Sequence, residues 1–267
     1  MPGGIVLSQN DTCQKPRRDT TIAGIPATTW GSPSPSVIVA IHGYFSSRVD
    51  PVVQVLAESA PCQVVSFDLP GHGSRHPVSG PQSWPEDALR DVNTILDWAH
   101  EFWSDVSIFA VSIGAYLSLL ASADRPLRHA WFLAPLTDLQ TMIRSSLEAA
   151  GVSEKQLERE GVVIAPSGER LTWAYFSFAT RHVPSHWPHP TDILHAASDQ
   201  TVPIEQSIAF ADHFGAHLTV LPDVEHWFHT PEQLRQLDTW LRDTNDSAIS
   251  THSPNGNIGR LHGSLNT

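Results

Sequence analysis

The sequence predicts an α/β protein with a mostly parallel central sheet that is flanked by helices. Short, continuously apolar runs recur along the chain and are typical of strands buried on both faces. Segments with apolar residues at helical spacing separate these runs. Strands that alternate with helices form parallel sheets covered on both faces. The chain has 267 residues, which is enough for one large domain with an insertion.

The predicted elements follow one another in a regular order. A weak hairpin pattern covers residues 20–30, and predicted buried strands then lie at 36–41, 63–67, 106–111, 128–133, 193–197 and 217–221. Apolar residues at helical spacing predict helices between most of these strands. The last helix begins after Thr230-Pro231-Glu232-Gln233, a capping box with proline at the first helical position.

The alternation is interrupted by residues 137–189, which contain helical patches, an aromatic run and three closing prolines. We expect this segment to form a small cap inserted after the sixth strand, with the core at 20–136 and 190–243. Residues 1–19 are predicted to be a loose N-terminal segment. Residues 244–267 are rich in Ser, Asn, Gly and Thr and predict a disordered tail.

Composition excludes several classes of function. The formal net charge is −12 and the chain has no Lys/Arg-rich run, so nucleic acid is not an expected partner. We find neither a signal-peptide pattern nor an apolar run of ~18 residues, so we expect a soluble cytoplasmic protein without membrane insertion. Two cysteines, Cys13 and Cys62, fit a reducing compartment. The sequence does not indicate an oligomeric state.

Ser112 lies between a β-branched apolar run and a run of small and apolar residues. A serine at such a strand–helix turn points its hydroxyl off the end of a parallel sheet, beside the first N–H groups of the helix. Ala110 and Gly114 are small, as the close passage of strand and helix requires. Ser112 is therefore a candidate nucleophile; the alternative interpretation is a simple helix cap.

Two further side chains follow predicted strands at the same edge of the sheet. Asp199 comes directly after the strand at 193–197, and His226 follows the strand at 217–221. A serine nucleophile needs a base and an acid that orients this base. The order Ser112, Asp199, His226 places one candidate for each role at the carboxyl ends of the strands.

Other residues compete for the acid and base roles. Asp138 follows the strand at 128–133 and is the strongest rival acid. Asp192 lies at the amino end of its strand, and Asp223 is expected to face solvent or cap a turn. His229 precedes a predicted helix cap and is expected to lie outside the pocket.

An oxyanion intermediate needs two convergent N–H donors. We expect one from Ile113, the residue after the candidate nucleophile. The other is expected from Tyr44, with Phe45 as the alternative, because Gly43 lets the backbone turn close to the substrate.

Taken together, these motifs resemble the α/β-hydrolase superfamily over about residues 36–242. The resemblance rests on Ile41-His42-Gly43-Tyr44, Asp68-Leu69-Pro70-Gly71-His72-Gly73-Ser74, Ala110-Val111-Ser112-Ile113-Gly114, Ser198-Asp199-Gln200-Thr201-Val202-Pro203 and Glu225-His226-Trp227. Ala110 departs from the family, which usually has glycine there. The segment 151–173 is similar to the cap of small bacterial hydrolases. The resemblance implies an α/β-hydrolase fold and cleavage of esters, thioesters or related acyl bonds.

Aromatic residues of the insertion either line a substrate pocket or pack the cap onto the core. Candidate pocket residues are Phe45, Met142, Trp173 and Trp227. His182, His186 and His189 are separated by prolines and have no nearby carboxylate, so we predict no metal site. No phosphate-binding glycine loop is present, and no cofactor is expected.

A serine at the elbow favours acyl transfer through a covalent acyl-enzyme. We therefore expect a serine hydrolase, most simply a carboxylesterase or thioesterase acting on a small-molecule acyl substrate. The same triad also serves C–C bond hydrolases, amidases and acyltransferases. A non-catalytic ligand-binding member of the fold is the alternative from another class.

Overall fold

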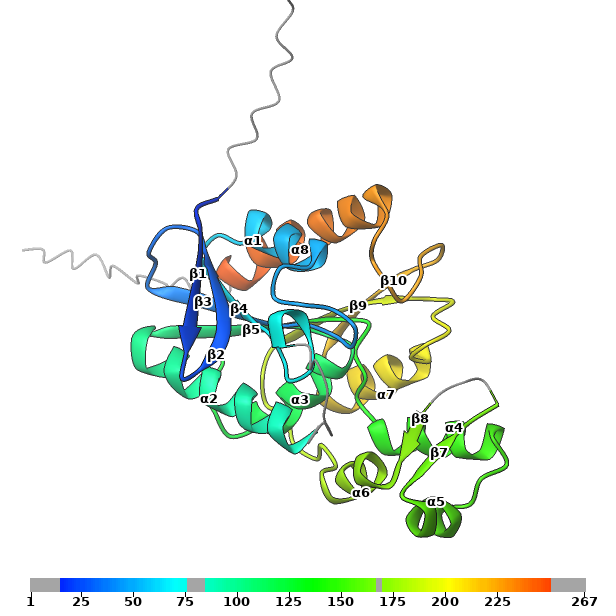
Figure 1. Cartoon of the computed structure of the whole chain (residues 1–267). Coiled ribbons are helices and arrows are strands. Elements are labelled where there is room, and N and C mark those ends of the chain that lie inside the picture. Colours follow the sequence, from blue (N-terminus) through cyan, green and yellow to red (C-terminus); the bar gives the residue numbers. More distant parts are fainter. Residues whose placement is uncertain (1–14, 76–84, 167–169, 251–267) are drawn as a thin grey trace, which may run out of the picture.

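The computed structural model describes residues 15–75, 85–166 and 170–250, with side chains to residue 245. Its main feature is an eight-stranded sheet with the order β1-β2-β4-β3-β5-β6-β9-β10 (Figure 1). The strands are β1 (Arg17–Ile22), β2 (Ile25–Trp30), β3 (Ser36–Ile41), β4 (Gln63–Phe67), β5 (Asp105–Val111), β6 (Ala130–Leu133), β9 (Thr191–Ala196) and β10 (His217–Leu221). Only the β1–β2 and β2–β4 pairs of this sheet are antiparallel. The prediction of a mostly parallel sheet is confirmed.

Helices cover both faces of the sheet (Figure 1). One layer contains α1 (Pro51–Ser59) and α8 (Pro231–Ser250), and the other contains α2 (Glu86–Phe102), α3 (Ile113–Ser122) and α7 (Ile204–Phe214). In β3, Val37 and Val39 belong to the core under α2 and α3, whereas Ile38 belongs to the core under α1 and α8. This alternation explains the continuous apolar run, because each face of the strand meets a helix layer.

The segment between β6 and β9 contains three helices and a small hairpin among its described residues. These elements are α4 (Leu139–Ala149), α5 (Glu154–Glu160), β7 (Val162–Ile164), β8 (Arg170–Thr172) and α6 (Trp173–Arg181). The strands β7 and β8 pair antiparallel, and the group lies at one end of the α3/α7 layer (Figure 1). Leu157, Leu171 and Phe176 continue the main hydrophobic core into this segment. Its action as a cap stays a prediction.

Both predicted terminal boundaries need correction. The strand β1 begins at Arg17, so the segment 1–19 predicted to be loose extends too far; residues 1–14 lie outside the described range. The first five residues of this strand are polar and exposed, and they are ordered by main-chain pairing with β2 rather than by an apolar pattern. The helix α8 continues to Ser250, beyond the predicted start of the tail at 244. Thr244 is buried there and accepts a hydrogen bond from Trp131 Nε1 at 3.0 Å.

Candidate active site

Ser112 occupies a strained turn between β5 and α3. Its φ is 51° and its ψ is −118°, a conformation that non-glycine residues rarely adopt. The surrounding backbone holds this turn, because Ser112 N donates to Leu133 O at 3.0 Å and Ser112 O accepts from Leu136 N at 3.1 Å. Such strain clusters at functional sites. Within the described chain, the Ser112 side chain makes no capping hydrogen bond to α3, which argues against the helix-cap interpretation.

The side chains of Ser112, His226 and Asp199 meet at the carboxyl edge of the sheet. His226 Nε2 lies 3.1 Å from Ser112 Oγ, and His226 Nδ1 lies 2.6 Å from Asp199 Oδ2. All three residues are buried. A carboxylate only accepts, so Nδ1 carries the ring proton, and Nε2 is left to accept the serine proton. The three residues that the sequence singled out are therefore arranged as nucleophile, base and acid would need to be.

Asp199 is held as a carboxylate. Its Oδ1 accepts the backbone N–H groups of Thr201 at 2.7 Å and Val202 at 2.9 Å. Burial by itself raises the pKa of Asp199, but hydrogen bonds from His195 and His226 and the backbone outweigh it and hold the pKa well below its usual value. The surroundings of this carboxyl group therefore favour its ionised form.

The competing residues have other partners. Asp138 is exposed and caps α4, accepting from Thr141 N at 2.9 Å. Asp192 contacts His129 at 2.8 Å and His217 at 3.1 Å at the amino end of β9. His229 is exposed, and its Nδ1 lies 2.6 Å from Trp227 O. The structure thus brings His226 to Asp199 rather than to Asp138.

The loop after β3 borders Ser112 and is fixed by His42. Burial lowers the pKa of His42 to about 4, so the ring is neutral. Leu69 N donates to Nε2 at 3.1 Å, and Nδ1 donates to Gly43 O at 2.7 Å. In a trans peptide the C=O and N–H point in opposite directions, so fixing Gly43 O also fixes the direction of Tyr44 N–H.

The two expected oxyanion donors come from segments next to Ser112. A Cβ on Gly43 would lie 3.4 Å from Ser112 Cβ, so this loop passes directly over the serine. Ile113 is the first residue of α3, where N–H groups have no intrahelical acceptor. Phe45, the alternative donor, follows with φ +61° and a side chain that is 82% exposed.

A buried ion pair supports the same loop from behind. Asp68 is buried, pairs with the guanidinium of Arg48, and accepts from Arg48 N at 2.8 Å and Ser74 N at 2.9 Å. Burial raises the pKa of Asp68, but these hydrogen bonds and the Arg48 charge outweigh it and lower the pKa. The turn after β4 is thereby tied to the loop that carries Tyr44.

The four predicted pocket residues have different neighbours in the structure. A cavity of about 330 Å³ borders the loop after β3, and Phe45 is the one predicted pocket residue that lines it among the described residues. The half-exposed ring of Trp227 lies 5.0 Å from that of His226. Met142 and Trp173 instead pack against the main core. Both side chains are partly buried there, and their place in a substrate pocket stays a prediction.

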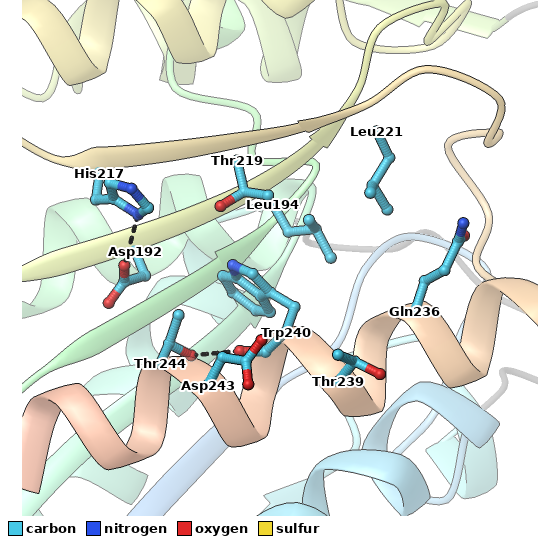
Figure 2. Close-up of a pocket in the computed structure, with 10 residues that line it drawn as sticks. All are labelled: Asp192, Leu194, His217, Thr219, Leu221, Gln236, Thr239, Trp240, Asp243 and Thr244. Carbon is cyan, nitrogen blue, oxygen red and sulfur yellow. Dashed lines mark hydrogen bonds and ion pairs between the residues drawn. The ribbon is translucent and has the colours of Figure 1, made fainter.

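A larger cavity, of about 640 Å³, lies elsewhere, between β9, β10 and α8 (Figure 2). Its walls include Asp192 and His217 at the amino ends of the strands, and Trp240 of α8 points toward them. None of Ser112, Asp199 or His226 lines it in the described structure. The candidate triad is therefore separate from this cavity.

Sequence reasoning missed one residue at the site. His195 of β9 is fully buried, and its Nε2 lies 3.3 Å from Asp199 Oδ2. The signal was its place four residues before Asp199 inside an apolar strand, where a buried histidine needs polar partners.

Among the described residues, no group of three or more His, Cys, Asp and Glu side chains is placed to hold a metal ion. None of the helices in the described ranges has the length and hydropathy to cross a membrane.

Comparison with known proteins gives the family. The model of the Alpha/beta hydrolase family matches residues 38–250. No curated protein matches the chain significantly. Among solved structures, Est1E from Butyrivibrio proteoclasticus with bound ferulic acid is 18% identical with a TM-score of 0.70, covering 87% of this chain and 99% of that one. Mouse alpha/beta hydrolase domain-containing protein 10 is 19% identical with a TM-score of 0.70 and the same coverage.

The esterase Pf2001 from Pyrococcus furiosus is 15% identical with a TM-score of 0.58, covering 93% of this chain and 95% of that one. These likenesses show a shared fold. Because the family model spans most of the sequence and the fold agrees with it, the chain belongs to the alpha/beta hydrolase family.

Proposed function

We propose that this protein is a serine hydrolase that cleaves a carboxylic ester, or a thioester, through an acyl-enzyme. The observation that carries the proposal is the hydrogen-bonded series from Ser112 Oγ to His226 at 3.1 Å and from His226 to Asp199 at 2.6 Å. This series ends on a serine in a strained elbow beside the N-terminus of α3. A serine hydroxyl becomes nucleophilic only with such a base.

In the proposed reaction, His226 Nε2 takes the Ser112 proton while Oγ attacks the substrate carbonyl carbon. The oxyanion lies between the N–H groups of Tyr44 and Ile113. His226, now protonated, gives its proton to the leaving alcohol or thiol, and the acyl-enzyme remains. Water then attacks with His226 as base, and the acid is released with Ser112 regenerated. Asp199 stays ionised and stabilises the imidazolium throughout.

The surroundings of Ser112 favour an uncharged acyl substrate with apolar parts. Tyr44, Phe45 and Trp227 are exposed aromatic side chains close to the proposed triad and oxyanion loop. Aromatic rings provide large contact areas for apolar groups. The fold neighbour Est1E binds ferulic acid, and Pf2001 is an esterase, so aryl and alkyl esters are the first substrates to test.

A fluorophosphonate probe, which reacts with activated serines, tests the proposal. We expect labelling of the wild type and of the control Ser118→Ala. Ser118 is a buried serine of α3, and its hydroxyl donates to Gly114 O. We expect no labelling of Ser112→Ala. An unlabelled wild type, or equal labelling of Ser112→Ala, would overturn the proposal and leave the non-catalytic ligand-binding alternative.

A substrate panel then separates the reaction types. We expect hydrolysis of p-nitrophenyl esters of increasing acyl length, and methyl ferulate and an acyl thioester extend the panel. Anilides test for amidase activity, and added alcohols test for acyl transfer. A labelled enzyme that cleaves no ester or thioester would retain the nucleophile but contradict the esterase assignment.

A further inference from the structure

His195 lies beside the proposed triad but is not part of it. It belongs to β9 and is fully buried. Its Nδ1 lies 2.6 Å from Ser207 Oγ, and its Nε2 lies 3.0 Å from Val202 O and 3.3 Å from Asp199 Oδ2. An imidazole in such a place is destabilising unless its nitrogens are paired.

These partners fix which ring nitrogen carries the proton. Val202 O and the Asp199 carboxylate accept hydrogen bonds and donate none, so the proton is on Nε2. Nδ1 then accepts from the Ser207 hydroxyl, which donates at 2.6 Å. The ring thus presents one N–H that is shared between the carbonyl of Val202 and the carboxylate of Asp199.

This N–H is the second hydrogen-bond donor near Asp199 Oδ2, after His226 Nδ1. Asp199 Oδ1 is fixed by the N–H groups of Thr201 and Val202, so the loop itself holds one oxygen. Oδ2 receives His226 Nδ1 and is approached by His195 Nε2. Without His195, His226 would be the one side chain among the described residues that holds Oδ2, and it is the ring that the carboxylate has to orient.

We propose that His195, held by Ser207, is a positioning residue that keeps Asp199 Oδ2 directed at His226. This inference rests on the proposed hydrolase function. The Nε2–H group of His195 also stabilises the negative charge of the Asp199 carboxylate while His226 is neutral. As the ring of His226 becomes positive in the reaction, Oδ2 is already in place to stabilise it, so no reorganisation of the acid is needed.

Two amide substitutions test the role of the N–H. The side-chain amide of His195→Gln reaches about as far as Nε2 and can donate to Asp199, whereas the shorter amide of His195→Asn reaches only toward Ser207. We expect His195→Asn to lower kcat by about 10- to 100-fold, typical of a lost hydrogen bond to a charged group, with little change in KM. We expect His195→Gln to stay within a few-fold of the wild type.

A spectroscopic readout separates positioning from simple packing. The proton between His226 Nδ1 and Asp199 Oδ2 should give a far-downfield resonance in the wild type and in His195→Gln. In His195→Asn this resonance should move upfield or broaden, because Oδ2 is no longer fixed. A residue that only filled the core would change the unfolding midpoint and leave both the resonance and the kcat of the folded enzyme unchanged.

The matched control is His129, a buried histidine that contacts Asp192 at 2.8 Å away from the proposed triad. We expect His129→Asn to keep the wild-type kcat and resonance. If His195→Asn has the kcat and the resonance of the wild type, the inference is overturned. Labelling that depends on Ser112 would still support the proposed hydrolase in that case. If instead the probe labels Ser112→Ala as strongly as the wild type, the proposed function on which the inference rests is overturned.

Discussion

Gly114 packs against Ile41 so closely that no side chain fits between them. A Cβ at residue 114 would lie 2.5 Å from Ile41 O and 2.8 Å from His42 O. Both oxygens belong to backbone that carries the loop over Ser112, so neither can move away easily. The absence of a side chain at this position is what lets α3 begin directly under the loop after β3.

Gly114→Ala should therefore destabilise the protein by about 1–3 kcal/mol, the usual cost of overpacking. Urea unfolding measures the change. Ala110→Gly, on the other side of Ser112, is the control; it removes a methyl group and should cost at most about 1 kcal/mol. A Gly114→Ala variant as stable as the wild type would show that the strand and helix separate without difficulty.

Asp199→Asn should lower kcat by roughly 10³- to 10⁴-fold, because an amide that donates toward His226 favours the wrong tautomer. Asp138→Asn is the matched control, since Asp138 caps α4 through Thr141 N and does not contact His226. We expect its kcat to equal that of the wild type. Steady-state kinetics with a p-nitrophenyl ester measure both, and a larger loss in Asp138→Asn would reverse the choice of acid.

The stability of the fold should depend on pH through His42. Its pKa falls from 6.5 to about 4 on folding because the ring is buried. Between these pH values the unfolded chain binds a proton that the folded chain does not. The contribution of neutral His42 to the free energy of unfolding is therefore complete above pH 6.5 and is lost as the pH falls toward 4. The full effect is about 3 kcal/mol.

Urea unfolding at a series of pH values across this window measures the slope. His100 and His189 also have lowered pKa values from burial and add to the slope in the same direction. His42→Gln should flatten the slope without removing it. An identical slope in the variant would mean that His42 does not titrate differently in the two states.

Arg48→Met should lower the free energy of unfolding by about 3 kcal/mol or more, because it leaves the buried carboxylate of Asp68 without its cation. Adding Asp68→Asn to this variant removes the uncompensated charge and should recover part of the stability. Thermal or urea unfolding of the wild type, the two single variants and the double variant forms a complete cycle. If the double variant loses more free energy of unfolding than the two single variants lose together, this explanation is wrong.

Thr244→Val should destabilise the protein by about 1–3 kcal/mol, since it leaves the buried Trp131 indole N–H without its acceptor. Thr239→Val on the same helix is the control, because Thr239 is exposed and its hydroxyl bonds only the Arg235 carbonyl among the described residues. Equal stability of the two variants would mean that α8 contributes little to the fold beyond residue 243.

The elements of the core could be predicted because their signals are local. Strands buried on both faces read as continuous apolar runs, and β3 shows why, since Ile38 and Val39 meet different helix layers. Ser112 was identified in the same way, from the small residues around a strand–helix junction. The two ends of the core were misjudged because β1 and the end of α8 are polar and depend on pairing and packing with distant residues.

The sequence by itself determined the order of strands and helices and the edge of the sheet where Ser112, Asp199 and His226 emerge. Periodicity and chain direction suffice for this, because parallel strands end at a common edge. Only the tertiary structure decided that His226 meets Asp199 and not Asp138, that Met142 and Trp173 pack against the core, and that His195 contacts the carboxylate. Each of these depends on distances between side chains from separate elements, which no local pattern records.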